Sequence, residues 1–484
     1  MKSIKYIFAI FLLLATDGCE DFLERTHPGD LTYDKFYQNE EHFEASITAC
    51  YYSLKKQVEE LIAFTDLITD NVWCDYYVSS DYINFKSASI PTNSSIIQSF
   101  WGACYKSISY SNILITRIEN SSVKGAIREV FIKEAKFIRA YSYFNLVRIY
   151  GGVPKYEQEP SNLNDTYSIG RSSTDDIYDF IIRDLKEVLD IDIKRSTEQK
   201  KFVKGRVTSL AAKTLLGKVY LQSGDYQNAL ATLEDIVKNS GLELENNLED
   251  LYDPDGFSNE IIFAVNYERV AGENSPFTAK TLPRFSRDIL PNVKTQDNGI
   301  GDWILEPHTV SKFSDNDKRK ELIDSIEVVF GSIGKVTLYY SKKYLDINTT
   351  EDFQSGSDFI VLRYADVLLM YADALNKTNG SNAYLYLNKV RERAGLEPLS
   401  SNLSKEQLNK ALAEERQKEF ILEGDRWFDL SYRGFDFLKK TLNDFYPYGA
   451  RYPEASIKDH QVLFPIPSDE VNLKPDYLPQ NPGY

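Results

Sequence analysis

Aromatic and polar side chains gather in two weakly periodic segments, residues 66–93 and 268–303. Binding a sugar ring requires flat apolar surfaces for its C–H faces and hydrogen-bonding groups for its hydroxyls. The first segment offers Asp66, Asp70, Asn71, Trp73, Tyr76, Tyr77 and Tyr82. The second offers Tyr267, Phe277, Arg284, Phe285, Asn298 and Trp303. Trp73 and Trp303 are the best candidates for ring platforms, although a buried loop anchor would have the same sequence.

A second chemical candidate is a row of carboxylates. Glu415, Glu419 and Glu423 recur at four-residue steps, and two suitably spaced acids could cleave a glycosidic bond. Arg416 and Arg426 are interleaved with them, which is typical of structural ion pairs between helices. We therefore interpret this segment as architectural and expect no enzyme activity.

Motifs for other chemistry are missing from the sequence. It contains no nucleophile elbow, Walker loop, dinucleotide glycine pattern or H-E-x-x-H, and its four histidines are scattered. Cys50, Cys74 and Cys104 lack a C-x-x-C spacing and allow at most one bridge within the chain. The net charge of −16 would repel phosphate backbones. We expect no metal, no cofactor and no nucleic acid partner.

The N-terminus has the pattern of a bacterial lipoprotein precursor. Lys2 and Lys5 flank the start of an apolar run that ends near Ala15, and Gly18 precedes Cys19. The run of about ten residues is too short for a hydrocarbon core of roughly 30 Å, so it predicts a removed signal over 1–18. Acylated Cys19 and the extended residues 19–33 would then form a lipid anchor and tether. The alternative is an ordinary secretory signal with a chance cysteine.

Helical periodicity dominates the remaining chain. Val130, Phe137 and Phe144 recur at seven-residue steps, as in a helix packed on another helix. Glu134 lies within this stripe and is expected to meet an arginine such as Arg416. Predicted helices cover 41–56, 95–119, 124–150, 174–189, 208–223, 226–239, 359–377, 382–394 and 405–423. Predicted strands cover 259–265 and 336–340.

Residues 212–238 match the spacing of a tetratricopeptide helix hairpin. Gly217 and Ala229 are small where the two helices must approach closely, and Asp225 is a good N-cap between them. A weaker copy covers 371–393, with Ser381 as the predicted N-cap. One repeat cannot bury its own apolar face, so several helix pairs should stack. The sequence predicts a mostly α, tetratricopeptide-like scaffold over 34–484 with an irregular, loop-rich insert.

Several segments, in a shared order, resemble the SusD/RagB family from Cys19 to Tyr484. Among them are Cys19-Glu-Asp-Phe-Leu-Glu24, Glu134-Ala-Lys-Phe-Ile-Arg-Ala140, Tyr150-Gly-Gly-Val-Pro154, Leu362-Arg-Tyr-Ala-Asp-Val-Leu-Leu369, Glu423-Gly-Asp-Arg-Trp-Phe-Asp-Leu430 and Gln480-Asn-Pro-Gly-Tyr484. The resemblance implies a lipoprotein anchored in the outer membrane and facing the cell exterior. Its implied partner is a SusC-like TonB-dependent barrel transporter. Site residues cannot be carried over, because members of the family differ most in these loops.

Four functions compete on these grounds. The leading hypothesis is a non-catalytic receptor that binds oligosaccharide or polysaccharide nutrient and delivers it to the barrel. A peptide-capturing receptor of the same family, a protein-only assembly scaffold and a surface glycoside hydrolase are the alternatives.

Overall fold

The computed structural model describes residues 36–484 apart from 76–77, 192–204, 285, 287–298, 331–333 and 350–353. The predicted signal, Cys19 and the tether lie outside the described residues, as do Tyr76, Tyr77, Phe285 and Asn298. Within the described part, no helix combines the length and apolar character that a bilayer crossing requires.

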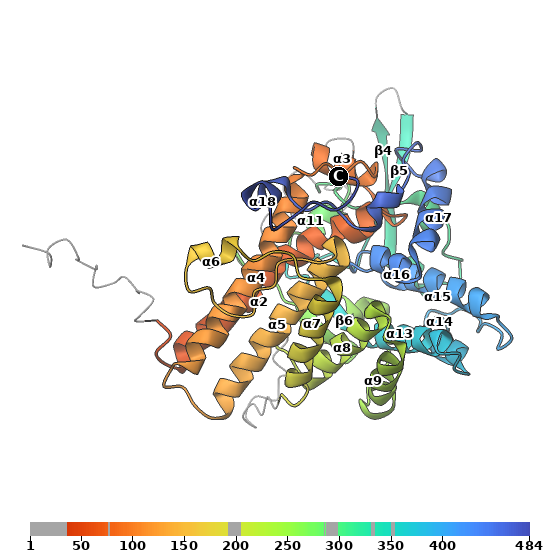
Figure 1. Cartoon of the computed structure of the whole chain (residues 1–484). Helices are drawn as coiled ribbons and strands as arrows, with labels where there is room; N and C mark the ends of the chain where they lie inside the picture. Colours follow the sequence, from red (N-terminus) through yellow and green to blue (C-terminus); the bar gives the residue numbers. More distant parts are fainter. Residues whose placement is uncertain are drawn as a thin grey trace, which may run out of the picture.

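Long helices lie side by side in chain order and form the body of the protein (Figure 1). They are α2 (Glu40–Ile62), α4 (Ser95–Glu119), α5 (Ala126–Tyr150), α7 (Thr174–Val188), α8 (Ser209–Ser223), α9 (Tyr226–Asn239), α13 (Tyr364–Lys377), α14 (Ala383–Arg393) and α15 (Lys405–Glu419). Each packs on a neighbour in the series, so the apolar stripes merge into one large core. The mostly α, tetratricopeptide-like scaffold expected from the periodicity is confirmed.

The hairpin of α8 and α9 shows why residues 212–238 fold as a tetratricopeptide unit. A Cβ atom on Gly217 would lie 2.8 Å from Leu233 Cδ2, so glycine permits the close approach of the two helices. The Asp225 carboxylate caps α9 by accepting from Asn228 N–H at 3.2 Å. The second copy is α13 with α14, but Ser381 is not its cap. The N-cap is Asn382, in the left-handed region with φ of 68°.

Strands connect the stack to the irregular half. The prediction of one helix over 359–377 is wrong at its start, because Phe359–Arg363 form strand β6, which pairs antiparallel with β2 (Ile261–Val265). Four further strands form a sheet of order β1-β3-β5-β4, and the long β4–β5 hairpin projects from the body (Figure 1). These are β1 (Val72–Trp73), β3 (Ile304–Leu305), β4 (Ile323–Phe330) and β5 (Gly334–Ser341).

Short helices complete the irregular half and the C-terminal part. They are η1 (Ala63–Leu67, a π-helix), α3 (Ser80–Lys86), α6 (Leu163–Tyr167), α10 (Leu248–Leu251), α11 (Phe277–Thr281), α12 (Pro307–Val310), η4 (Lys318–Leu322), α16 (Arg426–Tyr432), α17 (Phe435–Phe445), η5 (Tyr446–Tyr448), η6 (Asp459–Val462) and α18 (Ser468–Leu473). The described residues of the segment 66–93 are therefore organised around η1, β1 and α3. Near the end of the chain, α18 lies over α4 (Figure 1).

Buried ion pairs hold these parts together. Glu419 Oε1 accepts from Arg363 Nη1 at 2.6 Å and from Arg393, and its Oε2 accepts from Arg319 Nη1 at 3.1 Å. Burial acts to raise the pKa of Glu419, but these three guanidinium groups hold it well below its usual value. Glu415 and Glu423 are likewise engaged by basic side chains, which confirms the architectural interpretation of the carboxylate row.

Two further sequence expectations can be compared with the structure. Glu134 is indeed a paired core charge, but its partner is Arg206 and not Arg416, which instead binds Asp366, Asp425 and Asp429. The reason lies in the packing of the chain. Glu134 on α5 lies beside the segment that leads into α8, and that segment contains Arg206. Cys50, Cys74 and Cys104 are buried free thiols, and burial raises the pKa of Cys50 to about 12.

Candidate binding groove

Most of the predicted loop candidates lie in the interior. Trp303 is 1% exposed and packs against Phe277, with ring centroids 5.6 Å apart. Trp73 is 3% exposed in a small core of its own with Ile304 and Tyr340. These rings have no face open to a ligand in this structure. This burial corrects the expectation that Trp73, Trp303 and Phe277 form a platform.

The polar candidates of the first segment fasten the loop to the C-terminal helices. The guanidinium of Arg426 meets both carboxylate oxygens of Asp70, at 2.8 and 2.9 Å. Asp66 Oδ1 accepts from Asn71 Nδ2 at 2.7 Å and from Leu422 N–H at 2.9 Å. Burial raises the pKa of Asp66 to about 6. Asp66, Asp70 and Asn71 are at most 1% exposed, so their hydrogen bonds serve the fold.

Tyr82 and Arg284 are the described candidates that reach the surface. Both are half-buried. The Tyr82 hydroxyl accepts from Lys280 Nζ at 2.9 Å, and Arg284 Nε donates to Asp75 Oδ2 at 3.2 Å. The structure does not bring these two side chains together with Trp73 or Trp303 on one open surface. They remain candidates for ligand contact.

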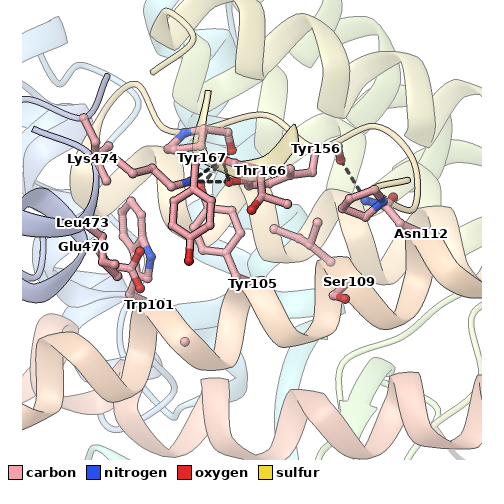
Figure 2. Close-up of a pocket in the computed structure, with 15 residues that line it drawn as sticks. Trp101, Tyr105, Ser109, Asn112, Tyr156, Thr166, Tyr167, Glu470, Leu473 and Lys474 are labelled. Atoms are coloured by element: carbon pink, nitrogen blue, oxygen red, sulfur yellow. Dashed lines mark hydrogen bonds between the residues drawn. The ribbon is translucent and has the colours of Figure 1, made fainter. Parts of the chain in front are cut away.

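A groove with the expected chemistry lies elsewhere, between α4, the connection from α5 to α7, and α18. Figure 2 shows Trp101, Tyr105, Ser109 and Asn112 on one face of α4, below Tyr156, Thr166 and Tyr167 and beside Glu470, Leu473 and Lys474. Its cavity measures about 330 Å³, within the usual range of small-molecule sites. From Trp101 to Asn112 the helix rises about 17 Å, so the groove is elongated.

Three tyrosines contribute ring surfaces to this groove, beside aliphatic residues such as Ile108 and Leu473. Tyr105 and Tyr156 meet edge to face, with centroids 5.7 Å apart, and Tyr105 is held by donating to the Pro154 carbonyl at 2.8 Å. Tyr167, on α6, is 47% exposed and stands at the rim (Figure 2). Trp101 is 4% exposed and packs in the core against Tyr150, as the helical pattern predicts, while also lining the floor of the groove.

Charged and amide groups border the rings. Lys474 Nζ donates to the Tyr156 hydroxyl at 2.8 Å and to the Thr166 carbonyl at 2.6 Å, which fixes α18 against the connection. Burial and neighbouring Asp469 raise the pKa of Glu470, while Lys474 opposes the shift. Asn112 is buried, donates to the Tyr156 carbonyl at 2.9 Å and accepts from Arg139 Nη1 at 2.6 Å, so its amide holds the wall of the groove, whereas the Ser109 hydroxyl is exposed. The groove therefore combines ring surfaces with hydrogen-bonding groups along its edges.

The sequence carried a partial signal for this groove. Trp101, Tyr105, Ser109 and Asn112 follow one another at steps of four, four and three residues, which places them on one helix face. The residues of α18 lie more than 350 positions further along the chain. Their approach to α4 depends on tertiary packing, so sequence reasoning could not include them.

The stacked helical hairpins and the elongated groove define a binding protein built on a tetratricopeptide-like frame. Family comparisons agree with this class. A model described as "SusD family" matches residues 329–484, and one described as "Starch-binding associating with outer membrane" matches residues 21–221. The chain belongs to the SusD family.

Individual relatives support the assignment over the full length. SusD-like protein P25 of Formosa agariphila is 25% identical over 539 residues, covering 100% of both chains. A SusD-like protein of Bacteroides ovatus is 27% identical over 479 residues, covering 89% of this chain and 82% of the relative.

Solved structures share the fold. A laminarin binding SusD-like protein superposes with a TM-score of 0.76 at 24% identity, covering 93% of this chain and 100% of its own. Surface glycan-binding protein A of Bacteroides thetaiotaomicron, solved with laminarihexaose, gives 0.74 at 21% identity, covering 91% and 99%.

Proposed function

We propose that the protein is a non-catalytic cell-surface receptor that binds oligosaccharide or polysaccharide nutrient in the groove between α4 and α18. The observation that carries this proposal is the set of Tyr105, Tyr156 and Tyr167 rings beside Glu470 and the exposed hydroxyl of Ser109. Tyrosine rings suit the C–H faces of sugars, and carboxylates and hydroxyls exchange hydrogen bonds with sugar hydroxyls. Relatives whose names refer to laminarin, glycan and starch binding support the same ligand class.

Charge pairing supports a binding role over hydrolysis. The carboxylate row of Glu415, Glu419 and Glu423 is buried and engaged by arginines. These acids therefore face no cleft in which a glycosidic bond could lie. Among the described residues that line the groove, Glu470 is the only carboxylate and Lys474 lies four residues further along the same segment, while the remaining lining residues are uncharged (Figure 2). The half-buried Tyr82 and Arg284 on the insert are further proposed ligand contacts, and Tyr76 and Tyr77 stay sequence-based candidates outside the described residues.

The ligand class can be tested on affinity gels containing laminarin, starch, xylan, galactomannan or pectin. We expect purified residues 20–484 to be retarded by at least one of these polysaccharides and to release no reducing ends from it. Reducing ends would indicate a hydrolase. Retention of denatured casein without any polysaccharide would indicate a peptide receptor. Binding to none of these probes would contradict the receptor and favour the assembly scaffold.

We further propose that acyl chains on Cys19 anchor the protein to the outer leaflet of the outer membrane, where it delivers glycan to a SusC-like TonB-dependent barrel. Two lipid chains are needed for stable anchoring. Cys19→Ala is expected to move the protein from the membrane fraction to the medium, while a detergent extract of the native strain yields a large barrel protein with it. Unchanged membrane retention of Cys19→Ala would contradict the anchor, and purification without a barrel would contradict the partner.

A further inference from the structure

Gly102 stands in the middle of α4 without a conformational or packing reason for glycine. It lies in regular helix with no positive φ, and a Cβ atom there would have no atom within 4 Å. Glycine in a helix interior costs roughly 0.5–1 kcal/mol relative to alanine. The position is exposed. Because Gly102 has no side chain, the surface of α4 is uncovered at this position.

That uncovered surface separates two cavities. Gly102 lines the groove described above, and it also lines a second cavity of about 420 Å³ on the other side of α4. The second cavity lies between α2, α4 and residues 267–276, and Tyr52 and Tyr267 line it. Tyr52 is 46% exposed and is positioned by donating to the Gly272 carbonyl at 3.1 Å.

Side chains flank the uncovered surface along the helix. Gln98 and Ser99 lie one turn before Gly102, and Tyr105 and Lys106 lie one turn after it. Gln98 is drawn toward α18 by donating to Asp469 at 2.9 Å, and Ser99 donates to Glu60 at 2.9 Å. Both side chains are thereby bonded to other elements, and no atom lies within 4 Å of a Cβ position on Gly102, which both cavities share as a lining residue.

The charges of the second cavity are largely matched within the protein. Lys55 pairs with Glu273, and Lys56 lies 2.6 Å from Glu60 and 3.1 Å from Glu59. Hydroxyls of Ser53 and Ser99 and the amide of Asn274 add neutral hydrogen-bonding groups. Such a lining suits a neutral, hydroxyl-rich chain better than an anion, because two of its three lysines are already paired with carboxylates and the third, Lys106, lies over the Tyr110 ring.

We propose that one neutral polysaccharide chain occupies both cavities at once and crosses α4 over Gly102. This inference rests on the proposed function and adds the form of the ligand: the interior of a long chain, held by tyrosines on both sides of the helix. Two linked contact regions bind one chain more tightly than either alone, because the second contact forms at high effective concentration. Affinity should therefore rise steeply once a fragment is long enough to span both cavities.

Substitution of Gly102 tests the passage directly. Gly102→Leu places a branched side chain over the preceding turn, where the chain would cross. Gly102→Ala adds a single methyl group to open space and serves as the matched control. The ligand is the polysaccharide that retards the native protein most among laminarin, starch, xylan, galactomannan and pectin, used intact and as size-fractionated hydrolysate in calorimetry. Circular dichroism checks that each variant retains its helices.

We expect Gly102→Leu to lose at least roughly tenfold more affinity for long fragments than for short ones, and to show no rise of affinity with length. Gly102→Ala should follow the native length dependence. Native-like binding of long fragments by Gly102→Leu, or an equal loss for short and long fragments, would overturn the inference while leaving the receptor intact. Absence of any polysaccharide binding by the native protein would overturn both.

Discussion

Replacing Glu419 by glutamine is expected to lower the free energy of unfolding by about 3–5 kcal/mol, the cost of breaking a buried ion pair from one side. The substitution keeps the shape of the side chain but removes the charge that Arg319, Arg363 and Arg393 share. These arginines come from η4, the end of β6 and the end of α14, so the loss falls where the insert joins the helical stack. Urea unfolding followed by circular dichroism measures the change.

Glu414→Gln is the matched control for this prediction. Glu414 lies on the same helix and its side chain is 60% exposed, 3.8 Å from Lys410. Exposed pairs of this kind contribute about 0.3–0.5 kcal/mol, so the control should be close to the native protein. If Glu419→Gln is no less stable than Glu414→Gln, the arginine cluster does not depend on this carboxylate.

Tyr167→Ala is expected to weaken polysaccharide binding by about 1 kcal/mol or more, which is a loss of roughly fivefold or greater. Tyr167 stands at the rim of the groove, where its ring can cover one face of a sugar (Figure 2). Because the side chain is about half exposed, its removal leaves no large cavity, and the unfolding midpoint should hardly move. Calorimetric titration with the polysaccharide retained on the gels measures the effect.

Phe257→Ala provides the comparison for Tyr167→Ala. Phe257 is 55% exposed, of similar size, and does not belong to the groove lining. We expect it to bind polysaccharide like the native protein. Equal affinities of the two variants would place the ring contacts elsewhere, and the half-buried Tyr82 on the insert would then be the next residue to replace.

The helical frame could be predicted from local signals. The range of α4 agrees with the prediction residue for residue, and Asp225 caps α9 as expected. Such signals act within one or two turns, so they are visible in the sequence. The wrong helix prediction at Phe359–Arg363 has a long-range cause. This segment has an apolar pattern that a helix could also use, but its pairing with β2, nearly a hundred residues earlier, makes it a strand.

The loop candidates show what residue type alone cannot decide. Trp73 and Trp303 have the right chemistry for a platform, yet burial of large rings stabilises the insert itself. Asp70 has the right chemistry for a sugar hydroxyl, yet Arg426 reaches it from a helix over 350 residues away. Whether a ring or carboxylate faces a ligand or the core depends on these distant neighbours.

The amino-acid sequence by itself determined the helix-rich frame, the tetratricopeptide hairpin and the family, because periodicity, small residues at close contacts and ordered motifs are properties of the chain. Only the tertiary structure decided which aromatic residues remain accessible. Burial and groove formation arise when α18 meets α4 and when Asp70 meets Arg426. Those contacts depend on how distant segments pack, which local sequence does not encode.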